Sequence, residues 1–295
     1  MDILIEGQVM EIPPSSEPAK KDRAVSLEEI ELDVLCEAIY RYYGFDFREY
    51  ARSSLRRRVR NLLELEKLPS VSALQDRILH DKQIMERFLL NLSINVTSMF
   101  RDPGMYLSLR RNVVPMLQTY PSVRVWHAGC SSGEEAYSMS ILLEEEGLKK
   151  QCKIYATDFN EAIIKKAQSG VIPLSVMREY TGNYQRAGGK KSFSDYYTAK
   201  YDNAIISPAL RTPIIFSRHN LAIDGSFNEF NLIVCRNVMI YFNDDLRIRV
   251  LQLLHNSLCR FGILVLGNKE SLRFTPLEKH YKELDGPNRI YQRID

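Results

Sequence analysis

The loop between a predicted strand and a predicted helix carries residues that could hold a polar ligand. Residues 123–128 are mostly apolar and predict a short buried strand. Gly129 and Gly133 bracket the tight loop that follows, and Ser132 and Glu135 have capping-box spacing, so we expect a helix to begin there. Free backbone N–H groups at such a helix start favour an anionic group such as a carboxylate. An ordinary strand–helix connection has the same pattern, so the loop alone leaves both interpretations open.

An acidic residue after the next predicted strand adds a second candidate contact. The apolar run 152–156 ends in Thr157-Asp158, and a helix is expected from about Glu161. In nucleoside-binding α/β folds the carboxylate of an acidic residue at this position accepts hydrogen bonds from the ribose hydroxyls. The loop is not G-x-G-x-x-G, so a dinucleotide is poorly supported, whereas a nucleoside without a pyrophosphate, such as adenosylmethionine, fits better. The alternative is that Asp158 is only a helix N-cap or a turn residue.

The elements that position these residues are typical of an α/β domain. Apolar strands at 214–216, 230–235 and 262–266 follow, and the near-continuous apolar run at 230–235 is typical of a buried parallel strand. Asn243 and Asp244 can cap a helix from 246 to 258. Further predicted elements are a helix at 105–117, a helix ending at 146, an insertion of short helices and antiparallel strands at about 170–212, and a terminal hairpin of 281–284 with 289–293.

The region before this domain divides into a tail and a small helical domain. Residues 1–24 have no helical or strand period and predict a mobile tail. Residues 25–92 predict a helical domain, followed by a larger α/β domain at 93–295. Ser26 and Glu29 form a plausible capping box for the first helix, and Gly44 breaks it. Its apolar face is expected at Ile30, Val34 and Ile39. Further helices are expected at 71–80 and 82–91.

The second predicted helix is rich in arginine. Its apolar face is expected at Leu55, Val59, Leu62 and Leu63. The arginines that project beside this face are Arg56, Arg57 and Arg60, with Arg52 and Arg58 nearby. A dense run of one charge sign is either a solvated face or a binding surface, and the sequence leaves both open.

Composition limits the class of protein. The chain has 295 residues with 45% hydrophobic content and a formal net charge of +3, which does not by itself indicate a nucleic-acid-binding protein. The five cysteines have neither paired nor metal-ligand spacing, which is typical of a reducing cytoplasm, and we expect no metal. No apolar run approaches the roughly 20 residues that span a bilayer, and the N-terminus lacks a signal-peptide pattern. We therefore expect a cytoplasmic protein without membrane insertion.

Five motifs in this order resemble the CheR-type chemoreceptor glutamate methyltransferases. The resemblance covers about residue 32 to the C-terminus. The motifs are Asn-Val-Thr-Ser-Met-Phe-Arg at 95–101, Gly-Cys-Ser-Ser-Gly-Glu-Glu at 129–135, Ala-Thr-Asp at 156–158, His-Asn-Leu at 219–221 and Cys-Arg-Asn-Val-Met-Ile-Tyr-Phe at 235–242.

The resemblance implies an α/β fold: a Rossmann-like class I adenosylmethionine-dependent methyltransferase domain with an all-helical N-terminal domain and an inserted β-subdomain. The sheet is expected to have seven strands with the last one antiparallel. The residues implied at the cofactor site are Asn95, Thr97, Arg101, Gly129, Glu134, Asp158, Asn220, Leu221, Arg236 and Asn237. Arg101 and Tyr241 are implied beside the transferred methyl group as the catalytic residues.

The resemblance also implies a substrate and a partner. Methyl transfer from S-adenosyl-L-methionine to receptor glutamates gives methyl esters and S-adenosyl-L-homocysteine, and the partner is the cytoplasmic helical bundle of a chemoreceptor. Arg52, Arg56, Arg57 and Arg60 are candidates for docking on that acidic bundle. The insertion is shorter between Tyr197 and Ile205 than in relatives that bind a receptor C-terminal peptide, so we expect no such tether. We expect a monomer.

The residues suit this chemistry. A glutamate is already ionised near neutrality, so its attack on a sulfonium needs no general base. Arg101 can hold a carboxylate by paired hydrogen bonds and Tyr241 can fix its approach. Two other classes stay open: a methyltransferase acting on nucleic acid or another protein, and a non-catalytic adenosylmethionine-binding module. Base-amino methylation usually uses an Asp/Asn-Pro-Pro-aromatic segment, and this chain has Cys-Arg-Asn-Val at 235–238 instead.

Overall fold

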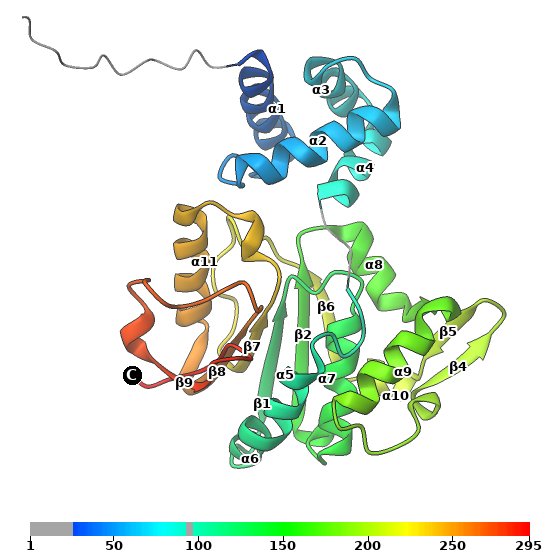
Figure 1. Cartoon of the computed structure of the whole chain (residues 1–295), viewed down its shortest axis with the longest axis vertical. Helices are drawn as coiled ribbons and strands as arrows, with labels where there is room; N and C mark the ends of the chain where they lie inside the picture. Colours follow the sequence, from blue (N-terminus) through cyan, green and yellow to red (C-terminus); the bar gives the residue numbers. More distant parts are fainter. Residues whose placement is uncertain (1–25, 93–96) are drawn as a thin grey trace, which may run out of the picture.

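The computed structural model contains a small helical domain that sits on an α/β domain (Figure 1). It describes residues 26–92 and 97–295. The predicted tail at 1–24 and the predicted site residue Asn95 lie outside the described residues. Within the described ranges, no helix is long and apolar enough to cross a membrane.

Four helices form the N-terminal domain and share one hydrophobic core. They are α1 (Leu27–Tyr43), α2 (Arg52–Glu66), α3 (Val71–His80) and α4 (Lys82–Leu92). The hydroxyl of Ser26 accepts the N–H of Glu29 at the start of α1, and Gly44 ends that helix in the left-handed conformation at φ +76°. Both predicted boundaries of α1 are thereby confirmed.

The predicted apolar face of α1 is wrong at Ile30 and Val34 and confirmed at Ile39. Ile30 and Val34 are 49% and 50% exposed, whereas the buried residues of this helix are Leu32, Leu35, Cys36 and Ile39. Two apolar stripes with helical spacing overlap in this sequence, and only one can face α2, α3 and α4. The buried face of α2 is predicted correctly at Leu55, Val59 and Leu62.

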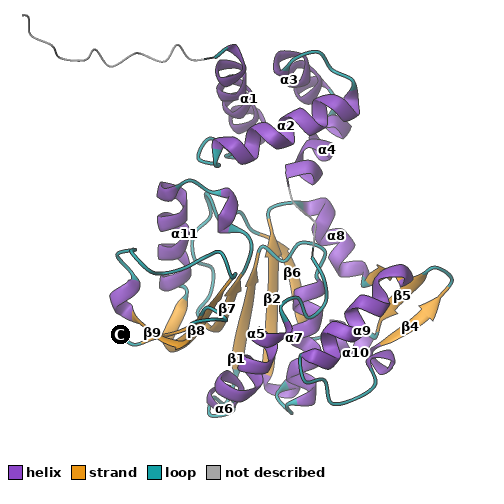
Figure 2. Cartoon of the chain, viewed as in Figure 1, coloured by secondary structure: helices purple, strands orange, loops and turns teal. Residues whose placement is uncertain are grey.

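A seven-stranded sheet is the centre of the α/β domain (Figure 2). In spatial order its strands are β6 (Ile214–Arg218), β2 (Cys152–Asp158), β1 (Val123–Ala128), β7 (Phe230–Cys235), β8 (Leu258–Leu266), β10 (Ile290–Arg293) and β9 (Tyr281–Asp285). The first five are parallel, and β10 runs antiparallel to both of its neighbours. This topology confirms the predicted sheet with an antiparallel last strand.

Helices cover both faces of the sheet, which explains its apolar strands. Val125 and Val234 pack on one face with α7 (Glu134–Glu145), and Trp126 and Ile233 pack on the other with α11 (Asp244–Asn256). The predicted boundary between α11 and the next strand is wrong, because the helix ends at Asn256 and β8 already begins at Leu258. The cap is predicted correctly, since the side chain of Asn243 accepts the N–H of Leu246 at 2.9 Å.

The helix predicted at 105–117 is one continuous helical segment with a wider turn in its middle. It comprises α5 (Pro103–Ser108), a π-helical turn (Leu109–Val113) and α6 (Val114–Leu117). The N–H of Val114 donates to the carbonyl oxygen of Leu109, five residues back. The next residue is Pro115, which has no N–H to donate, so the widened turn lets the helix continue past it.

The predicted insertion forms a separate lobe. A three-stranded antiparallel sheet in the order β3 (Val171–Pro173), β5 (Asn203–Ile206), β4 (Tyr197–Lys200) is joined to α9 (Met177–Arg186) and α10 (Pro208–Arg211), and α8 (Glu161–Ser169) leads into it. Short 3-10 turns lie at Lys149–Gln151, Leu174–Val176, Phe193–Tyr196, Met239–Tyr241 and Glu278–His280.

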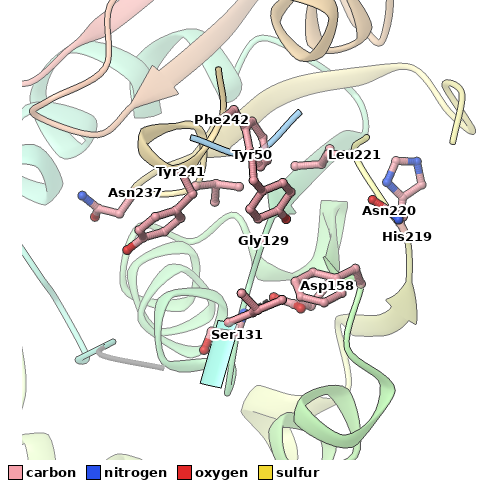
Figure 3. Close-up of a pocket in the computed structure, with 13 residues that line it drawn as sticks. Tyr50, Gly129, Ser131, Asp158, His219, Asn220, Leu221, Asn237, Tyr241 and Phe242 are labelled. Carbon is pink, nitrogen blue, oxygen red and sulfur yellow. Dashed lines mark hydrogen bonds between the residues drawn. The ribbon is translucent and has the colours of Figure 1, made fainter. Parts of the chain in front are cut away.

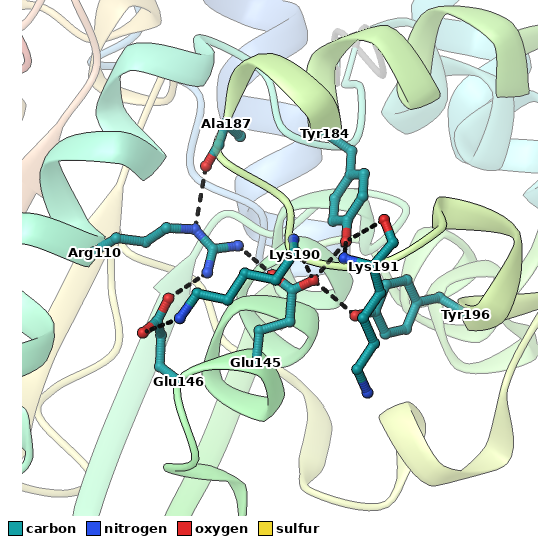
Figure 4. A network of polar contacts seen from close by, with 8 residues as sticks. All are labelled: Arg110, Glu145, Glu146, Tyr184, Ala187, Lys190, Lys191 and Tyr196. Atoms are coloured by element: carbon teal, nitrogen blue, oxygen red, sulfur yellow. Dashed lines mark hydrogen bonds and ion pairs between the residues drawn. The ribbon is translucent and has the colours of Figure 1, made fainter.

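A network of hydrogen bonds and ion pairs connects this lobe to the end of α7 (Figure 4). The guanidinium of Arg110 pairs with both Glu145 and Glu146 at the end of α7. The hydroxyl of Tyr196 donates to the carboxylate of Glu145 at 2.8 Å, and Lys190 pairs with Glu146 at 2.8 Å. Since Tyr196 and Lys190 belong to the insertion, this network holds the lobe in a fixed position.

Candidate active site

A pocket opens where the carboxyl ends of β1, β2 and β7 meet the helical domain (Figure 3). Carboxyl ends of neighbouring parallel strands meet at one edge of a sheet, which is the usual ligand position in such folds. The pocket is lined by Tyr50, Leu92, Gly129, Ser131, Asp158, Phe159, His219, Asn220, Leu221, Asn237, Val238, Tyr241 and Phe242. A smaller recess beside it is lined by Thr97, Ser98, Arg101, Gly129, Cys130, Ser131, Glu135, Arg236, Asn237 and Val238.

Gly129 and Gly133 both adopt a positive φ, and each has a further role in the loop. Gly129 has φ +81°, and a Cβ there would lie 2.4 Å from a methyl group of Val238. Gly133 has φ +92° and is the N-cap of α7. The N–H groups of Gly129 and Cys130 both donate to the carbonyl oxygen of Thr157 at 2.8 Å, so the loop is tied to the end of β2.

The predicted capping box at Ser132 and Glu135 is wrong. The hydroxyl of Ser132 donates to the carboxylate of Glu134 at 2.7 Å, and no side chain caps the start of α7. Glu135 instead contacts His127 at 2.9 Å and Arg236 at 3.1 Å. The N-cap of α7 is Gly133 and not Ser132, so Glu135 lies two residues after the cap instead of the three that a capping box requires.

Asp158 lies at the mouth of the pocket with its carboxylate directed at the glycine loop. One oxygen accepts the N–H of Ser131 at 3.0 Å and the other accepts the N–H of Asn160 at 3.1 Å. Burial raises the pKa of Asp158, and the backbone N–H groups of Asn160, Ser131 and Phe159 oppose that rise. The N-cap of α8 is Asn160, which accepts the N–H of Ala162 at 3.0 Å. Asp158 is therefore not the N-cap and can accept hydroxyl groups from a ligand.

A buried ion network lies under the recess. Arg236 pairs with Asp102 and with Glu135. Although burial acts to raise it, the pKa of Glu135 is lowered because His127 and Arg236 stabilise the carboxylate. Arg236 lines the recess, but its charged end is held by two acids of this chain. Its clearest contribution is to fix the segment at Asp102 against the start of α7.

Glu270 organises the turn after β7 and is not predicted from the sequence. It is 3% exposed, and its carboxylate accepts four backbone N–H groups. The donors are Gly267 at 2.7 Å, Asn237 at 2.9 Å, Val238 at 3.0 Å and Met239 at 2.8 Å. Burial raises the pKa of Glu270 and these four N–H groups oppose the rise. The turn that carries Asn237 and Tyr241 into the site is thereby fixed.

The helical domain completes the site around Tyr241. The N–H of Ala51 donates to the carbonyl oxygen of Tyr241 at 2.8 Å, and the rings of Tyr50 and Phe242 contact at a centroid distance of 5.2 Å. The guanidinium of Arg58 lies over the Tyr241 ring at 4.9 Å. Burial raises the pKa of Tyr241, and the positive charges of Arg58 and Arg101 oppose that rise. Tyr50 lines the pocket and Arg58 contacts the ring of Tyr241, and the sequence interpretation assigned neither residue to the site.

The structure brings most of the predicted site residues together. Gly129, Asp158, Asn220, Leu221, Asn237 and Tyr241 line the pocket. Thr97, Arg101 and Arg236 line the adjoining recess. Glu134 lines neither, because its carboxylate is buried against Ser132, and burial raises its pKa.

Three of the four arginines proposed for docking pair with acids of α1. Arg52 pairs with Asp33, Arg56 with Glu28 and Glu29, and Arg60 with Glu28. Arg57 is exposed, and no ion pair is found for it among the described residues. The surface is therefore less basic than the arginines alone suggest.

Comparison with known proteins decides the family. The family model described as "CheR methyltransferase, SAM binding domain" matches residues 95–288, and the family model described as "CheR methyltransferase, all-alpha domain" matches residues 30–93. The chain belongs to the CheR methyltransferase family. Both matched regions coincide with the two domains seen in the structure.

Relatives of this CheR protein carry related names. A Pseudomonas putida protein provisionally named methyltransferase Cher3 is 48% identical over 265 residues, which is 90% of this chain and 97% of that protein. A Listeria innocua chemotaxis protein methyltransferase is 31% identical, covering 83% of this chain and 92% of that protein. The solved structure of the N-methyltransferase NodS from Bradyrhizobium japonicum, in complex with S-adenosyl-L-homocysteine, aligns with a TM-score of 0.38 and 14% identity, over 68% of this chain and 90% of that chain.

The site fits the cofactor of the family. The carboxylate of Asp158 and the backbone of the 129–133 loop face one pocket, which suits the ribose and polar end of adenosylmethionine. This CheR protein is thus an adenosylmethionine-dependent methyltransferase. Among the residues described, no group of three or more His, Cys, Asp or Glu side chains could hold a metal ion.

Proposed function

We propose that this CheR protein methylates glutamate side chains on the cytoplasmic helical bundle of a chemoreceptor, forming glutamate methyl esters in sensory adaptation. The observation that supports this most strongly is the composition of one pocket. Asp158 and Tyr241 line the same cavity. Asp158 suits a nucleoside, and the positive charges of Arg58 and Arg101 act on Tyr241 and oppose the burial-driven rise of its pKa. A carboxylate is the acceptor that such positive charge favours.

The protein contributes positioning rather than proton transfer. Adenosylmethionine, when bound, supplies a methyl group on a positively charged sulfur. An ionised glutamate oxygen would take that methyl group, with the electron pair of the carbon–sulfur bond left on the sulfur, so the residues of this chain would not have to move a proton. In the proposed mechanism Arg101 and Tyr241 hold the acceptor carboxylate, while the apolar side chains of Phe242 and Val238 exclude water from the pocket.

Two alternative functions are less well supported. A base-amino methyltransferase usually has an Asp/Asn-Pro-Pro-aromatic segment after the strand that corresponds to β7, whereas this chain continues with Arg236, Asn237 and Val238. A non-catalytic binding module would not need both Arg101 and Tyr241 beside the pocket. The arginine-rich surface of α2, made of Arg52, Arg56, Arg57 and Arg60, is proposed to meet the acidic receptor bundle. We also propose that no receptor C-terminal peptide is bound, since the turn between β4 and β5 contains only Tyr201 and Asp202.

Labelled methyl transfer tests the proposed function. The protein is incubated with adenosylmethionine carrying a radiolabelled methyl group and with cytoplasmic receptor fragments, and the product is then treated with alkali. Glutamate methyl esters release volatile labelled methanol, whereas methylated bases and amines do not. Label that resists alkali, or label found on nucleic acid, would contradict the proposal.

A further inference from the structure

One of the connections between the parallel strands has no helix to cover the sheet. A helix follows β1, β2 and β7, namely α7, α8 and α11. The connection from β6 to β7 comprises residues 219–229, all of which the structure describes, and it contains no helix. Parallel sheets are normally covered on both faces by the helices of their connections. The face that this connection crosses is therefore covered by a loop alone.

That loop covers only part of the face. The ring of Phe227 lies 5.1 Å from the ring of Trp126 and 6.2 Å from the ring of Tyr155, measured between centroids. Phe227 itself is 44% exposed. A groove of about 1120 Å³ is lined by Tyr155 and by residues at the amino ends of β1, β2 and β6. The amino-terminal part of the face is thus open.

Basic and apolar side chains share this open part. The strand registers place Arg124 opposite Lys153, and Tyr155 opposite both Trp126 and Ile215. Because side chains alternate along a strand, Arg124, Lys153, Tyr155 and Ile215 all lie on the face of Trp126. These four residues, here named the open sheet face, line the groove. Arg124 and Lys153 are exposed, and Ile215 is 44% exposed.

The positive charge of the groove is only partly compensated by the chain itself. Arg124 donates to uncharged oxygens, an amide side chain at 3.1 Å and a backbone carbonyl at 3.3 Å. Lys149 pairs with Glu144 at 2.7 Å, whereas no ion pair is found for Arg124, Lys150 or Lys153 within residues 26–92 and 97–295. Like charges directly opposite each other on neighbouring strands repel. A carboxylate placed between Arg124 and Lys153 relieves that repulsion.

We propose that the open sheet face binds an acidic amphipathic helix of a partner protein, in the position that a connecting helix would otherwise occupy. Carboxylates of the helix pair with Arg124 and Lys153, and its apolar stripe covers Tyr155 and Ile215. The adenosylmethionine pocket lies at the carboxyl ends of the strands, at the other end of the sheet. Since β2 has seven residues and is about 23 Å long, helix and cofactor bind at the same time. The surface recruits the enzyme to a partner, whichever group the enzyme methylates.

A labelled peptide tests this contact. The probe is a fluorescein-labelled peptide of about 18 residues, about 27 Å long as a helix, with leucines along one face and glutamates beside them. A matched peptide has glutamine at every glutamate position. Fluorescence anisotropy measures the affinity of both peptides for wild type, Lys153→Glu, Ile215→Ser and the control Lys282→Glu. Lys282 is an exposed lysine of β9, at the opposite edge of the same sheet.

The proposed contact predicts a specific pattern. Wild type and Lys282→Glu should bind the glutamate peptide about ten-fold or more tightly than the glutamine peptide. Lys153→Glu should weaken binding of the glutamate peptide about ten-fold or more, and Ile215→Ser about three-fold. Lys153→Glu places opposite charges across from each other, so its melting temperature should equal or exceed that of wild type. Affinity for S-adenosyl-L-homocysteine should be the same in all variants, with and without peptide.

Four outcomes would overturn the inference. If wild type does not bind the glutamate peptide, or Lys153→Glu binds it as tightly as wild type, no acidic helix docks on this face. If single-stranded oligothymidine binds wild type more tightly than the peptide and Lys153→Glu abolishes that binding, the partner is a nucleic acid. If wild type self-associates in sedimentation and Lys153→Glu does not, the occupant is a second copy of this chain. If S-adenosyl-L-homocysteine displaces the peptide, the peptide occupies the cofactor pocket instead.

Discussion

The carboxylate of Asp158 accepts the backbone N–H of Ser131 at 3.0 Å, which joins the end of β2 to the loop after β1. The N–H groups of Gly129 and Cys130 strengthen the same junction by donating to Thr157. The acid and the glycine loop therefore form one preorganised surface rather than two separate contacts. A ligand that binds there does not have to order the loop first.

Asp158→Ala should weaken the binding of S-adenosyl-L-homocysteine by about 1.5–3 kcal/mol, because it removes a charged acceptor for hydroxyl groups. Calorimetry measures the change directly. Asp202→Ala, at an exposed turn of the insertion, is the matched control and should leave the affinity unaltered. Equal affinities for wild type and Asp158→Ala would mean that the cofactor lies elsewhere.

Tyr241→Phe and Arg101→Ala should each lower the methylation rate more than they lower the melting temperature. Tyr241 loses only its hydroxyl, so its ring can keep its contact with Arg58. Steady-state kinetics with a receptor fragment, together with thermal unfolding, separates the two effects. Arg101 also lines the recess next to the pocket, so a moderate loss of cofactor affinity is expected for that variant. Wild-type rates in both variants would exclude the catalytic assignment.

Glu270→Gln should lower both stability and activity, because the amide replaces one acceptor oxygen by a donor that faces backbone N–H groups. Four N–H groups converge on this carboxylate, so we expect a loss of about 1–3 kcal/mol in the free energy of unfolding. Urea denaturation measures the loss. Displacement of the turn should also reduce the affinity for S-adenosyl-L-homocysteine, and unchanged values for both quantities would refute the role of Glu270.

The pH dependence of stability tests the network at Glu135. Its folded-state pKa lies below the ordinary value of 4.5, so its ionised form stabilises the fold above that value. The contribution is lost as the pH falls below 4.5 and through the lowered folded-state pKa. Glu135→Gln should therefore cost about 3 kcal/mol at neutral pH, because it breaks the pair with Arg236. The difference from wild type should shrink in acid, and a difference that grows in acid would contradict this assignment.

Neutralising Arg56 and Arg60 should raise the KM for the receptor while leaving cofactor affinity unchanged. Both pair with Glu28, so Arg→Gln is a cleaner change than Arg→Glu, which would place like charges side by side. Charge–charge steering is screened beyond about 8–10 Å, so the wild-type rate should fall as salt increases. Equal KM values and equal salt dependence for wild type and the double variant would show that these arginines only form a solvated face and do not dock the receptor.

The parts of the site that lie close together in sequence are predictable from it. The loop at 129–133 and Asp158 each follow an apolar strand, and adjacent parallel strands necessarily bring them together. Arg58 and Glu270 are different, because each acts on Tyr241 or its turn across a large sequence distance, and nothing local marks them. The error at Ile30 has the same origin, since only the packing of α1 decides which of two apolar stripes is buried.

The chemical identity of the methylated group tests the central claim most directly. A receptor fragment treated with the enzyme and unlabelled adenosylmethionine is digested, and tandem mass spectrometry locates the added methyl group. The account predicts a methyl ester on a glutamate side chain, lost after alkaline treatment and absent when that glutamate is replaced by glutamine. A methyl group on lysine, arginine or nucleic acid, or one that survives alkali, would contradict it.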